Sequence, residues 1–301
     1  MMKVGLFIPF SGQVSHVQQE IRNGLGIGVN SDEWERVDFA VQYYQSNVQE
    51  DLQLALLHLE SVSGVSLILA VMDRNHESAM MACVKNCRCP IVLINMIKSR
   101  PVRDHGLRHV FMNSLFLSSS QFVLANFVRD LLDQQSCICL SEIGGITGLW
   151  DSLSGADHIK GNLMGYCQDA SDLIKVLEVS SKSLFSASTW FRELQNEANV
   201  EFVEHYQRRF AAIPSPFALL AYEIGLLLRN QYQKKYPRSQ NSIVSALRRI
   251  NVTGPRGAIN LRADCQRSSV VYVSKVGTRH KGGDDKREIV CREEYREASC
   301  G

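Results

Sequence analysis

The sequence lacks several features that assign a protein to a class at once. It has only 7 prolines in 301 residues and no proline-rich linker. No apolar run approaches the ~18 residues that a membrane-spanning helix needs, so we expect no direct membrane insertion. The net charge of +2 is too small to indicate a nucleic-acid partner. What remains is an ordinary globular composition, 45% hydrophobic and 21% charged, whose length suggests about two domains.

Sequence signatures of catalysis are also missing. There is no Gly-x-Ser-x-Gly elbow, phosphate-binding P-loop, His-Glu-x-x-His or Cys-x-x-Cys, and the 8 histidines are scattered. Gly24, Gly26 and Gly28 form G-x-G-x-G, but they lie inside an expected helix, well after the preceding strand. Close packing of that helix on a sheet explains them better than a dinucleotide site. We therefore expect no enzyme activity and no cofactor.

The cysteines do not indicate a disulfide framework, because their number, 9, is odd and the chain is long. Cys83, Cys87 and Cys89 are closely spaced, but not as zinc ligands are, and no second His or Cys pair follows at a suitable distance. We interpret them as small buried hydrophobic residues, which suits a reducing compartment, and expect no metal.

The N-terminal apolar stretch, Val4–Phe10, is shorter than the core of a typical signal peptide. It also lacks a small-residue cleavage site. We expect no export signal in the sequence as given, although a chain from which a leader had been removed would look the same.

Strand-like and helix-like segments alternate along the chain. Apolar or alternating runs predict strands at 4–9, 37–44, 65–71, 90–94, 110–113, 136–140, 163–166 and 183–187. Helical patterns occur at 17–29, 50–62, 78–85, 121–133, 146–153, 170–179, 196–210, 217–228 and 242–250. Residues 258–261 and 269–276 look like paired strands, and we expect the charged tail after Gly277 to be frayed or peripheral. The alternation predicts an α/β fold with mainly parallel sheets.

Several motifs follow one another in a defined order. They are Lys3–Gly12 with its Pro-Phe-Ser-Gly end, Gly24–Asn30, the F-x-x-x-Y-x-x-x-F-x-x-x-P segment Phe202–Pro214, Ala221-Tyr222-Glu223, and Gly254-Pro255-Arg256-Gly257-Ala258-Ile259. Together they resemble the type I periplasmic binding protein family, in the branch of the branched-chain amino acid receptors and related extracellular ligand-binding receptors. The resemblance extends over nearly the whole chain.

This resemblance implies two Rossmann-like lobes joined by a hinge, with a ligand cleft between them. The first lobe would comprise 1–117 and 216–253, and the second 118–215 and 254–301. The stretch between Cys137 and Glu201 is short for a full set of βα units, so we expect a reduced second lobe.

The implied function is that of a non-enzymatic solute-binding or sensor protein for a small polar ligand, amino acid-like or carboxylate. An ABC transporter membrane component or a signalling partner would receive the ligand-bound protein. The family implies a periplasmic or extracytoplasmic location, whereas free cysteines suit the cytoplasm. The alternative function is that of an α/β transferase or hydrolase acting on a small polar metabolite.

Ligands of such sheets bind beyond the carboxyl ends of the strands, so the expected ligand-binding residues lie in the loops there. By analogy with the family they are Phe10, Ser11, Asp73, Arg74, Asn75, His76, Asn95, Met96, Glu142, Trp150 and Trp190.

Three of these residues have a second interpretation. Arg74 beside its neighbouring aspartate suits a carboxylate, but such a pair can also be a solvated ion pair. Glu142 can be a turn residue, and Trp190 a core tryptophan. Residues 71–76 replace the family's usual small hydroxyl residues, which argues against a branched-chain amino acid and makes Arg74 the expected anchor.

Overall fold

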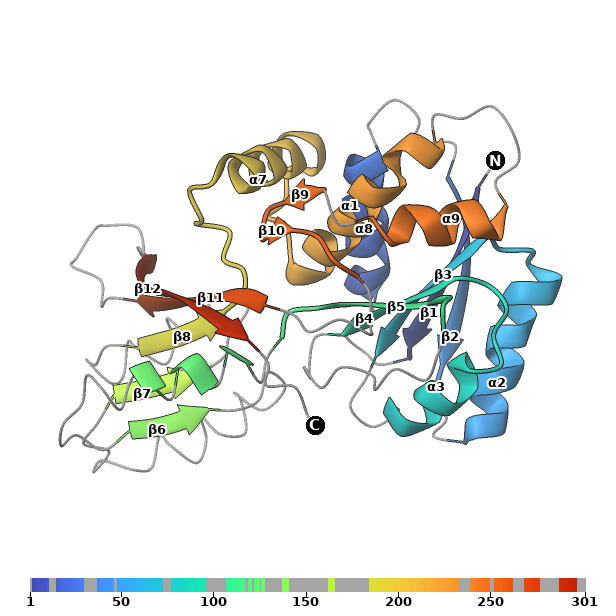
Figure 1. Cartoon of the computed structure of the whole chain (residues 1–301), viewed down its shortest axis with the longest axis horizontal. Helices are drawn as coiled ribbons and strands as arrows, with labels where there is room; N and C mark the ends of the chain where they lie inside the picture. The colour runs from blue at the N-terminus through green and yellow to red at the C-terminus, as the bar shows by residue number, and fades with distance from the viewer. Residues whose placement is uncertain are drawn as a thin grey trace. The chain divides into compact units, whose positions relative to one another are not determined.

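The computed structural model divides the chain into two compact units (Figure 1). Unit 1 comprises Met1–Leu115 and Gln195–Cys265, and unit 2 comprises Phe116–Leu194 and Gln266–Gly301. The lobe boundaries expected from the sequence differ from these units at 116–117, 195–215 and 254–265. The structure describes residues 2–10, 15–29, 37–45, 48–72, 77–95, 107–116, 119–120, 122–124, 126–127, 137–140, 162–165, 184–232, 239–249, 252–261, 268–276 and 287–296.

Unit 1 is built on a five-stranded sheet. Its strands are β1 (Lys3–Pro9), β2 (Asp38–Tyr44), β3 (Leu67–Met72), β4 (Ile91–Asn95) and β5 (Val110–Ser114). They lie in the order β2-β1-β3-β4-β5, and every neighbouring pair is parallel. All six residues of β3 are buried, as expected for an apolar strand that is covered on both faces. The predicted parallel sheet is confirmed here.

Helices cover both faces of this sheet (Figure 1). The helices of unit 1 are α1 (Ser15–Val29), α2 (Gln49–Leu57) with its π-helical continuation His58–Val62, α3 (Glu77–Val84), α7 (Glu197–Phe210), α8 (Pro216–Tyr232) and α9 (Gln240–Leu247), of which α7 packs against α1 and β9 rather than against the sheet. In Figure 1, α2 and α3 lie on one face, and α1, α8 and α9 on the other. No helix among the described residues is both long and apolar enough to cross a bilayer.

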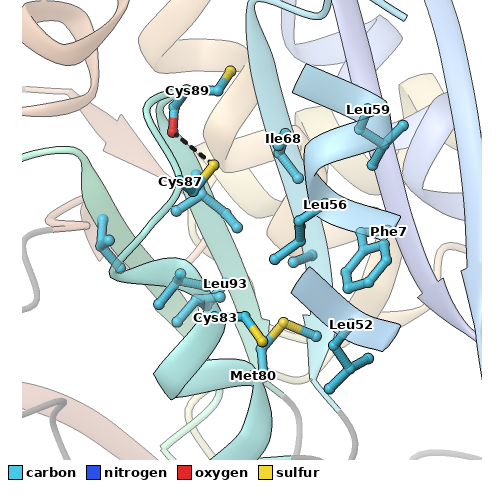
Figure 2. Packing of buried hydrophobic residues seen from close by; sticks show 14 of the residues in the cluster. Phe7, Leu52, Leu56, Leu59, Ile68, Met80, Cys83, Cys87, Cys89 and Leu93 are labelled. Atoms are coloured by element: carbon cyan, nitrogen blue, oxygen red, sulfur yellow. Dashed lines mark hydrogen bonds between the residues drawn. The ribbon is translucent and has the colours of Figure 1, made fainter. Parts of the chain in front are cut away.

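The core under α2 and α3 follows from the alternation of side chains along each strand. Phe7, Ile68 and Leu93 come from three different strands and meet one apolar face of α2. That face carries Leu52 and Leu56 (Figure 2). At ~25 cal/mol per Å² of buried apolar surface, contacts of this kind dominate the stability of the unit.

Glycines allow α1 and α8 to touch backbone to backbone. A Cβ on Gly24 would lie 2.0 Å from the carbonyl oxygen of Ala218, and one on Gly28 would lie 2.4 Å from that of Tyr222. The expected role of these glycines in close packing is confirmed, but their partner is another helix rather than the sheet. The sequence did not reveal that partner, because α8 lies far along the chain.

Unit 2 contains a mixed sheet. Its strands are β6 (Cys137–Leu140), β7 (Asn162–Gly165), β8 (Leu184–Ser188), β11 (Ser268–Val276) and β12 (Arg287–Arg296). The order is β12-β11-β8-β7-β6, in which β6, β7 and β8 are parallel to one another, while β11 is antiparallel to β8 and to β12. The helix expected at 121–133 is present at the described residues 122–124 and 126–127. Those expected at 146–153 and 170–179 lie outside the described residues.

The pairing corrects one sequence-based expectation about the last strands, and for the tail it decides between frayed and peripheral. Residues 258–261 do not pair with 269–276. Instead, β9 (Thr253–Gly254) and β10 (Gly257–Ala258) form their own small hairpin in unit 1. The charged tail is not frayed at 287–296, because these residues form β12 at the edge of the sheet, where alternate side chains can stay in water.

Candidate functional site at the carboxyl edge of the unit 1 sheet

The parallel register brings the carboxyl ends of the strands in unit 1 to one edge of the sheet. Pro9 at the end of β1 pairs with Tyr44 of β2, and Met72 at the end of β3 pairs with Asn95 of β4. Asn95 in turn pairs with Ser114 of β5. This edge is where ligands of open α/β sheets bind, so the loops that leave it form the candidate site.

Two exposed aromatic rings lie at this edge. The Phe10 side chain is 60% exposed and the Tyr43 side chain 40%, and the two rings meet edge to face with centroids 6.2 Å apart. The backbone N–H of Phe10 donates to the carbonyl oxygen of Tyr44 over 2.6 Å, so the chain is fixed where it leaves β1. Because the pair lies at the edge where ligands of open α/β sheets bind, we take it as a candidate for contact with a ligand.

The position of the Tyr43 ring is set by a contact with α1. Its hydroxyl donates to Oε1 of Gln18 over 2.6 Å. The next residue, Tyr44, is buried and donates to the carbonyl oxygen of Val71 on β3 over 2.7 Å. These hydrogen bonds join α1, β2 and β3 at the carboxyl edge, so the edge is preorganised rather than loose.

Most of the predicted ligand-binding residues lie outside the described part of the chain. Those residues are Ser11, Asp73, Arg74, Asn75, His76, Met96, Glu142 and Trp150. Phe10 is found exposed at the edge, and Asn95 is the last residue of β4. Trp190, in unit 2, is only 6% exposed, and its backbone N–H donates to Oγ of Ser188 over 3.2 Å. Tyr43 was missed, because its strand pattern does not reveal that its side chain stays in water.

A buried charged cluster in unit 1 was also missed. Arg256 donates from Nε to Oε1 of Glu223 over 2.9 Å, and from Nη2 to Oδ1 of Asn113 over 2.7 Å. The side chain of Glu223 is only 2% exposed, and that of Arg256 12%. The sequence signal was a single carboxylate inside the apolar helix predicted at 217–228, because a buried carboxylate needs a cation nearby.

Three cysteines of unit 1, Cys83, Cys87 and Cys89, are free thiols in the core (Figure 2). Cys83, Cys87 and Cys89 are buried, and the thiol of Cys87 donates to the carbonyl oxygen of Cys89 over 3.5 Å. Burial raises the pKa of Cys87 to about 12 and also raises the pKa of Cys89. The interpretation as small buried hydrophobic residues is confirmed for these three. Among the described residues no group of three His, Cys, Asp or Glu is arranged to hold a metal ion.

Comparison with known proteins connects this architecture to one family. Residues 143–284 match the family model described as periplasmic binding protein. A solute-binding protein of an ABC transporter from Rhodopseudomonas palustris, solved with benzoate, is 13% identical, with a TM-score of 0.71 and 98% of each chain covered. This chain has the fold of a type I periplasmic binding protein. The resemblance drawn from the motifs is thereby confirmed.

Two further binding proteins of this fold show similar agreement. The branched-chain amino acid transporter substrate-binding protein LivJ of Streptococcus pneumoniae, solved with isoleucine, is 14% identical, with a TM-score of 0.67 and coverage of 99% of this chain and 100% of that one. The leucine-binding protein LivK of Thermotoga maritima is 14% identical, with a TM-score of 0.65 and coverage of 97% and 98%. No curated protein matches the chain.

One motif of the periplasmic-binding-protein resemblance now has a physical explanation. In the F-x-x-x-Y-x-x-x-F segment, Phe202 and Tyr206 of α7 are buried on one face of the helix. Phe202 stacks on Tyr222 of α8 with ring centroids 4.5 Å apart, and Tyr206 meets Phe210 edge to face at 4.9 Å. The spacing of four residues therefore places these aromatic rings on one face of α7, where Phe202 packs against α8.

Proposed function

We propose that this chain is a non-enzymatic solute-binding protein that binds a small carboxylate or amino acid-like ligand at the carboxyl edge of unit 1. The observation that carries the proposal is the likeness of fold along almost the whole length of both chains. The family match over residues 143–284 supports it from the sequence side. The alternative, a transferase or hydrolase, has no comparable support.

The ligand class follows from chemistry that the solved relatives share. Their ligands include 3,4-dihydroxybenzoic acid, benzoate and isoleucine, and each carries a carboxylate. We assign the carboxylate to Arg74, since a guanidinium can bind both oxygens at once. We assign the apolar body of the ligand to the exposed rings of Phe10 and Tyr43, which lie 6.2 Å apart at the same edge. The predicted residues Ser11, Asp73, Asn75, His76, Asn95 and Met96, which end or follow strands of the same sheet, complete the proposed site.

Thermal shift with benzoate, 4-hydroxybenzoate, isoleucine and leucine, followed by calorimetry, tests this function directly. A ligand at 100 times its dissociation constant should stabilise the protein by ~2.7 kcal/mol. Nuclear magnetic resonance of the same mixtures should show each compound unchanged after prolonged incubation. Conversion of the best ligand into a product would replace the proposal by the enzyme alternative.

The roles of Arg74 and Phe10 can be separated with matched variants. Arg74→Ala should weaken every carboxylate by about 1.5–3 kcal/mol, the range for hydrogen bonds to charged groups. Arg88→Ala removes the same charge from an exposed position that precedes β4, at the other edge of the sheet, and should leave affinity unchanged. Equal affinities of the Arg74→Ala variant and the unmodified protein would reject Arg74 as the anchor.

Phe10→Ala should weaken benzoate more than isoleucine, because an aromatic ring gains stacking or edge contacts worth about 0.5–1.5 kcal/mol beyond area burial. The control is Leu54→Ala, which truncates a side chain on α2 that is 64% exposed. Equal losses for both ligands would show that the aromatic pair does not select a ring.

The proposal extends to the partner and the location. An ABC transporter membrane component would receive the ligand, since two of the solved relatives are solute-binding proteins of ABC transporters. The family resemblance favours an extracytoplasmic site, whereas the free thiols of unit 1 suit a reducing compartment. Cell fractionation of the natural host, with site-resolved thiol labelling, decides between the two.

A further inference from the structure

The chain passes between the two units three times, and each passage begins or ends beside the same small hairpin. The chain leaves unit 1 after Leu115, returns at Gln195 and leaves again after Cys265. The hairpin consists of β9 and β10 with the turn Pro255–Arg256 between them. We call it the 253–258 hairpin.

At the first passage, the hairpin holds the end of β5. Nη1 of Arg256 donates to the carbonyl oxygen of Ser114, the residue before Leu115, and Nη2 donates to Oδ1 of Asn113 over 2.7 Å. Both Asn113 and Ser114 are buried, at 3% and 0% exposure. The last two residues of β5 are therefore bound to the hairpin in a site largely closed to water, where such bonds are strong.

The hairpin is itself held on α8 by Glu223. Its carboxylate receives two hydrogen bonds from Arg256, a paired geometry that fixes the plane of the guanidinium. The same carboxylate accepts from Nδ2 of Asn113 over 3.1 Å, and that amide also donates to the carbonyl oxygen of Leu220 over 2.9 Å. One guanidinium thus links β5, α8 and the hairpin.

At the second passage, Asn196 performs a similar task. Its Nδ2 donates to the carbonyl oxygen of Pro255 in the hairpin turn over 3.1 Å. Its Oδ1 accepts from the backbone N–H of Asn199 over 3.0 Å and so caps α7. A single side chain therefore ties the start of α7, just after the chain returns to unit 1, to the hairpin.

The third passage leaves directly from the hairpin. Residues 258–261 continue from β10, and the carbonyl oxygen of Leu261 accepts from the backbone N–H of Met112 on β5 over 2.9 Å. Ile259 also donates its backbone N–H to the carbonyl oxygen of Val252 over 2.8 Å, which closes the base of the hairpin. All three passages are thus connected to one element of unit 1.

We propose that the 253–258 hairpin is a clasp that fixes the three connecting segments to unit 1. While the hairpin is in place all three segments are held, and when it loosens all three become mobile. Motion of unit 2 relative to unit 1 then begins just outside the clasp. Phe116, the first residue beyond the first passage, has φ of 52°. A bulky residue rarely adopts this left-handed conformation, so backbone strain is stored at that point. This inference does not depend on the proposed ligand.

Hydrogen exchange measured by mass spectrometry tests the clasp in the ligand-free protein. Arg256→Lys keeps the positive charge beside Glu223 but loses the planar guanidinium that donates to acceptors on three residues, Glu223, Asn113 and Ser114. We expect exchange to rise by about tenfold or more in peptides covering 112–116, 194–198 and 252–261 together, while β1 and β4 keep their protection. The control Ile243→Val removes one methylene from the α9 core and should leave these three regions unchanged relative to the rest.

A second variant keeps the test decisive if Arg256→Lys fails to fold. Asn196→Asp retains the oxygen that caps α7 but removes the donor to Pro255. The clasp predicts a rise in exchange confined to 194–198, with 112–116 still protected. A uniform rise over the whole of unit 1, or no change at 194–198, would overturn the proposal. So would a rise at 112–116 alone in Arg256→Lys.

Discussion

The two units expose their sheets to water to different degrees. In the five-stranded sheet of unit 1 every strand pair is parallel, and β3 is buried along its whole length. In unit 2 the outer strands β11 and β12 are antiparallel, and β12 keeps Glu288, Arg292 and Glu294 exposed. Parallel strands require helices on both faces, whereas a charged antiparallel edge can face solvent and resists pairing with another chain. The charged side chains of β12 thus suit an edge strand that faces water.

Among the described residues, the buried polar side chains also differ between the two units. In unit 1 they are Asn23, Asn113, Ser114, Asn199 and Glu223. In unit 2 they are all hydroxyl residues, namely Ser119, Ser120, Ser186, Ser188, Thr189 and Ser274. A hydroxyl can both donate and accept, so it is easily satisfied by a near neighbour, while a buried carboxylate needs a dedicated cation. Unit 1 therefore depends more strongly on particular partners than unit 2 does.

The largest expected effect follows from removing Arg256, the cation that pairs with the buried Glu223 in unit 1. Arg256→Met should lower the free energy of unfolding by about 3–5 kcal/mol, because it leaves the buried carboxylate of Glu223 without its partner. Urea denaturation measures this. Lys3→Ala is the control, since the Lys3–Asp38 pair is 3.6 Å long and half-exposed, and should change stability by less than about 1 kcal/mol. Similar losses for both variants would show that the burial of the Glu223 carboxylate does not set the cost of losing its partner.

A slightly smaller loss is expected at the contact of α1 with α8. Gly24→Ala should destabilise unit 1 by about 3 kcal/mol, because the new methyl group would overlap backbone atoms that cannot rotate away. Gly64→Ala is an informative counterpart, since nothing lies near its would-be Cβ and only its φ of 62° opposes the change. Its cost should be about 1–2 kcal/mol. Thermal unfolding of both variants compares the cost of steric overlap at Gly24 with the cost of backbone strain at Gly64.

In unit 2 the hydroxyl pair should matter less. The Oγ atoms of Ser186 and Ser274 lie 2.9 Å apart, and both residues are buried. Ser186→Ala should cost about 1–2 kcal/mol because it leaves one hydroxyl without this partner, whereas changing both serines to alanine should be nearly neutral. A double variant less stable than either single variant would contradict this account of the pair.

The smallest expected effect is a gain in unit 1. Ala211 ends α7 in the left-handed conformation, with φ of 50°, and its side chain is exposed. Ala211→Gly should raise the free energy of unfolding by about 0.5–1 kcal/mol, because glycine adopts this conformation without a Cβ penalty. Ala212→Gly, one position beyond, should bring no gain, and chemical denaturation of the two variants separates the conformational effect from chain flexibility.

The fold of unit 1 was predictable because its signals are local and strong. Segments such as 65–71 are continuously apolar, and the helices between them have clear apolar faces, so the order of elements fixes a parallel sheet. The pairing of β11 was not predictable, because apolar alternation shows that a strand exists but not which strand lies beside it. Residues 258–261 are close in sequence to 269–276 but do not pair with them. Ala258 pairs instead with Thr253 in the hairpin of β9 and β10.

The candidate site was predicted only where it depends on a strand end. Phe10 follows β1 directly, and its exposure agrees with a role at the edge. Tyr43 depends on a contact with α1 that no local pattern reveals. Arg256 and Glu223 are far apart in sequence, and only the burial of a lone carboxylate in an apolar helix could have prompted a search for its cation.

The free thiols in the core of unit 1 have a consequence for the timing of folding. A thiol must be ionised and accessible to form a disulfide, and Cys83, Cys87 and Cys89 meet neither condition once buried. Oxidation can therefore compete only while the chain is still open. Disulfide formation takes seconds to hours, so the time for which an oxidant can reach these thiols is set by how fast unit 1 folds.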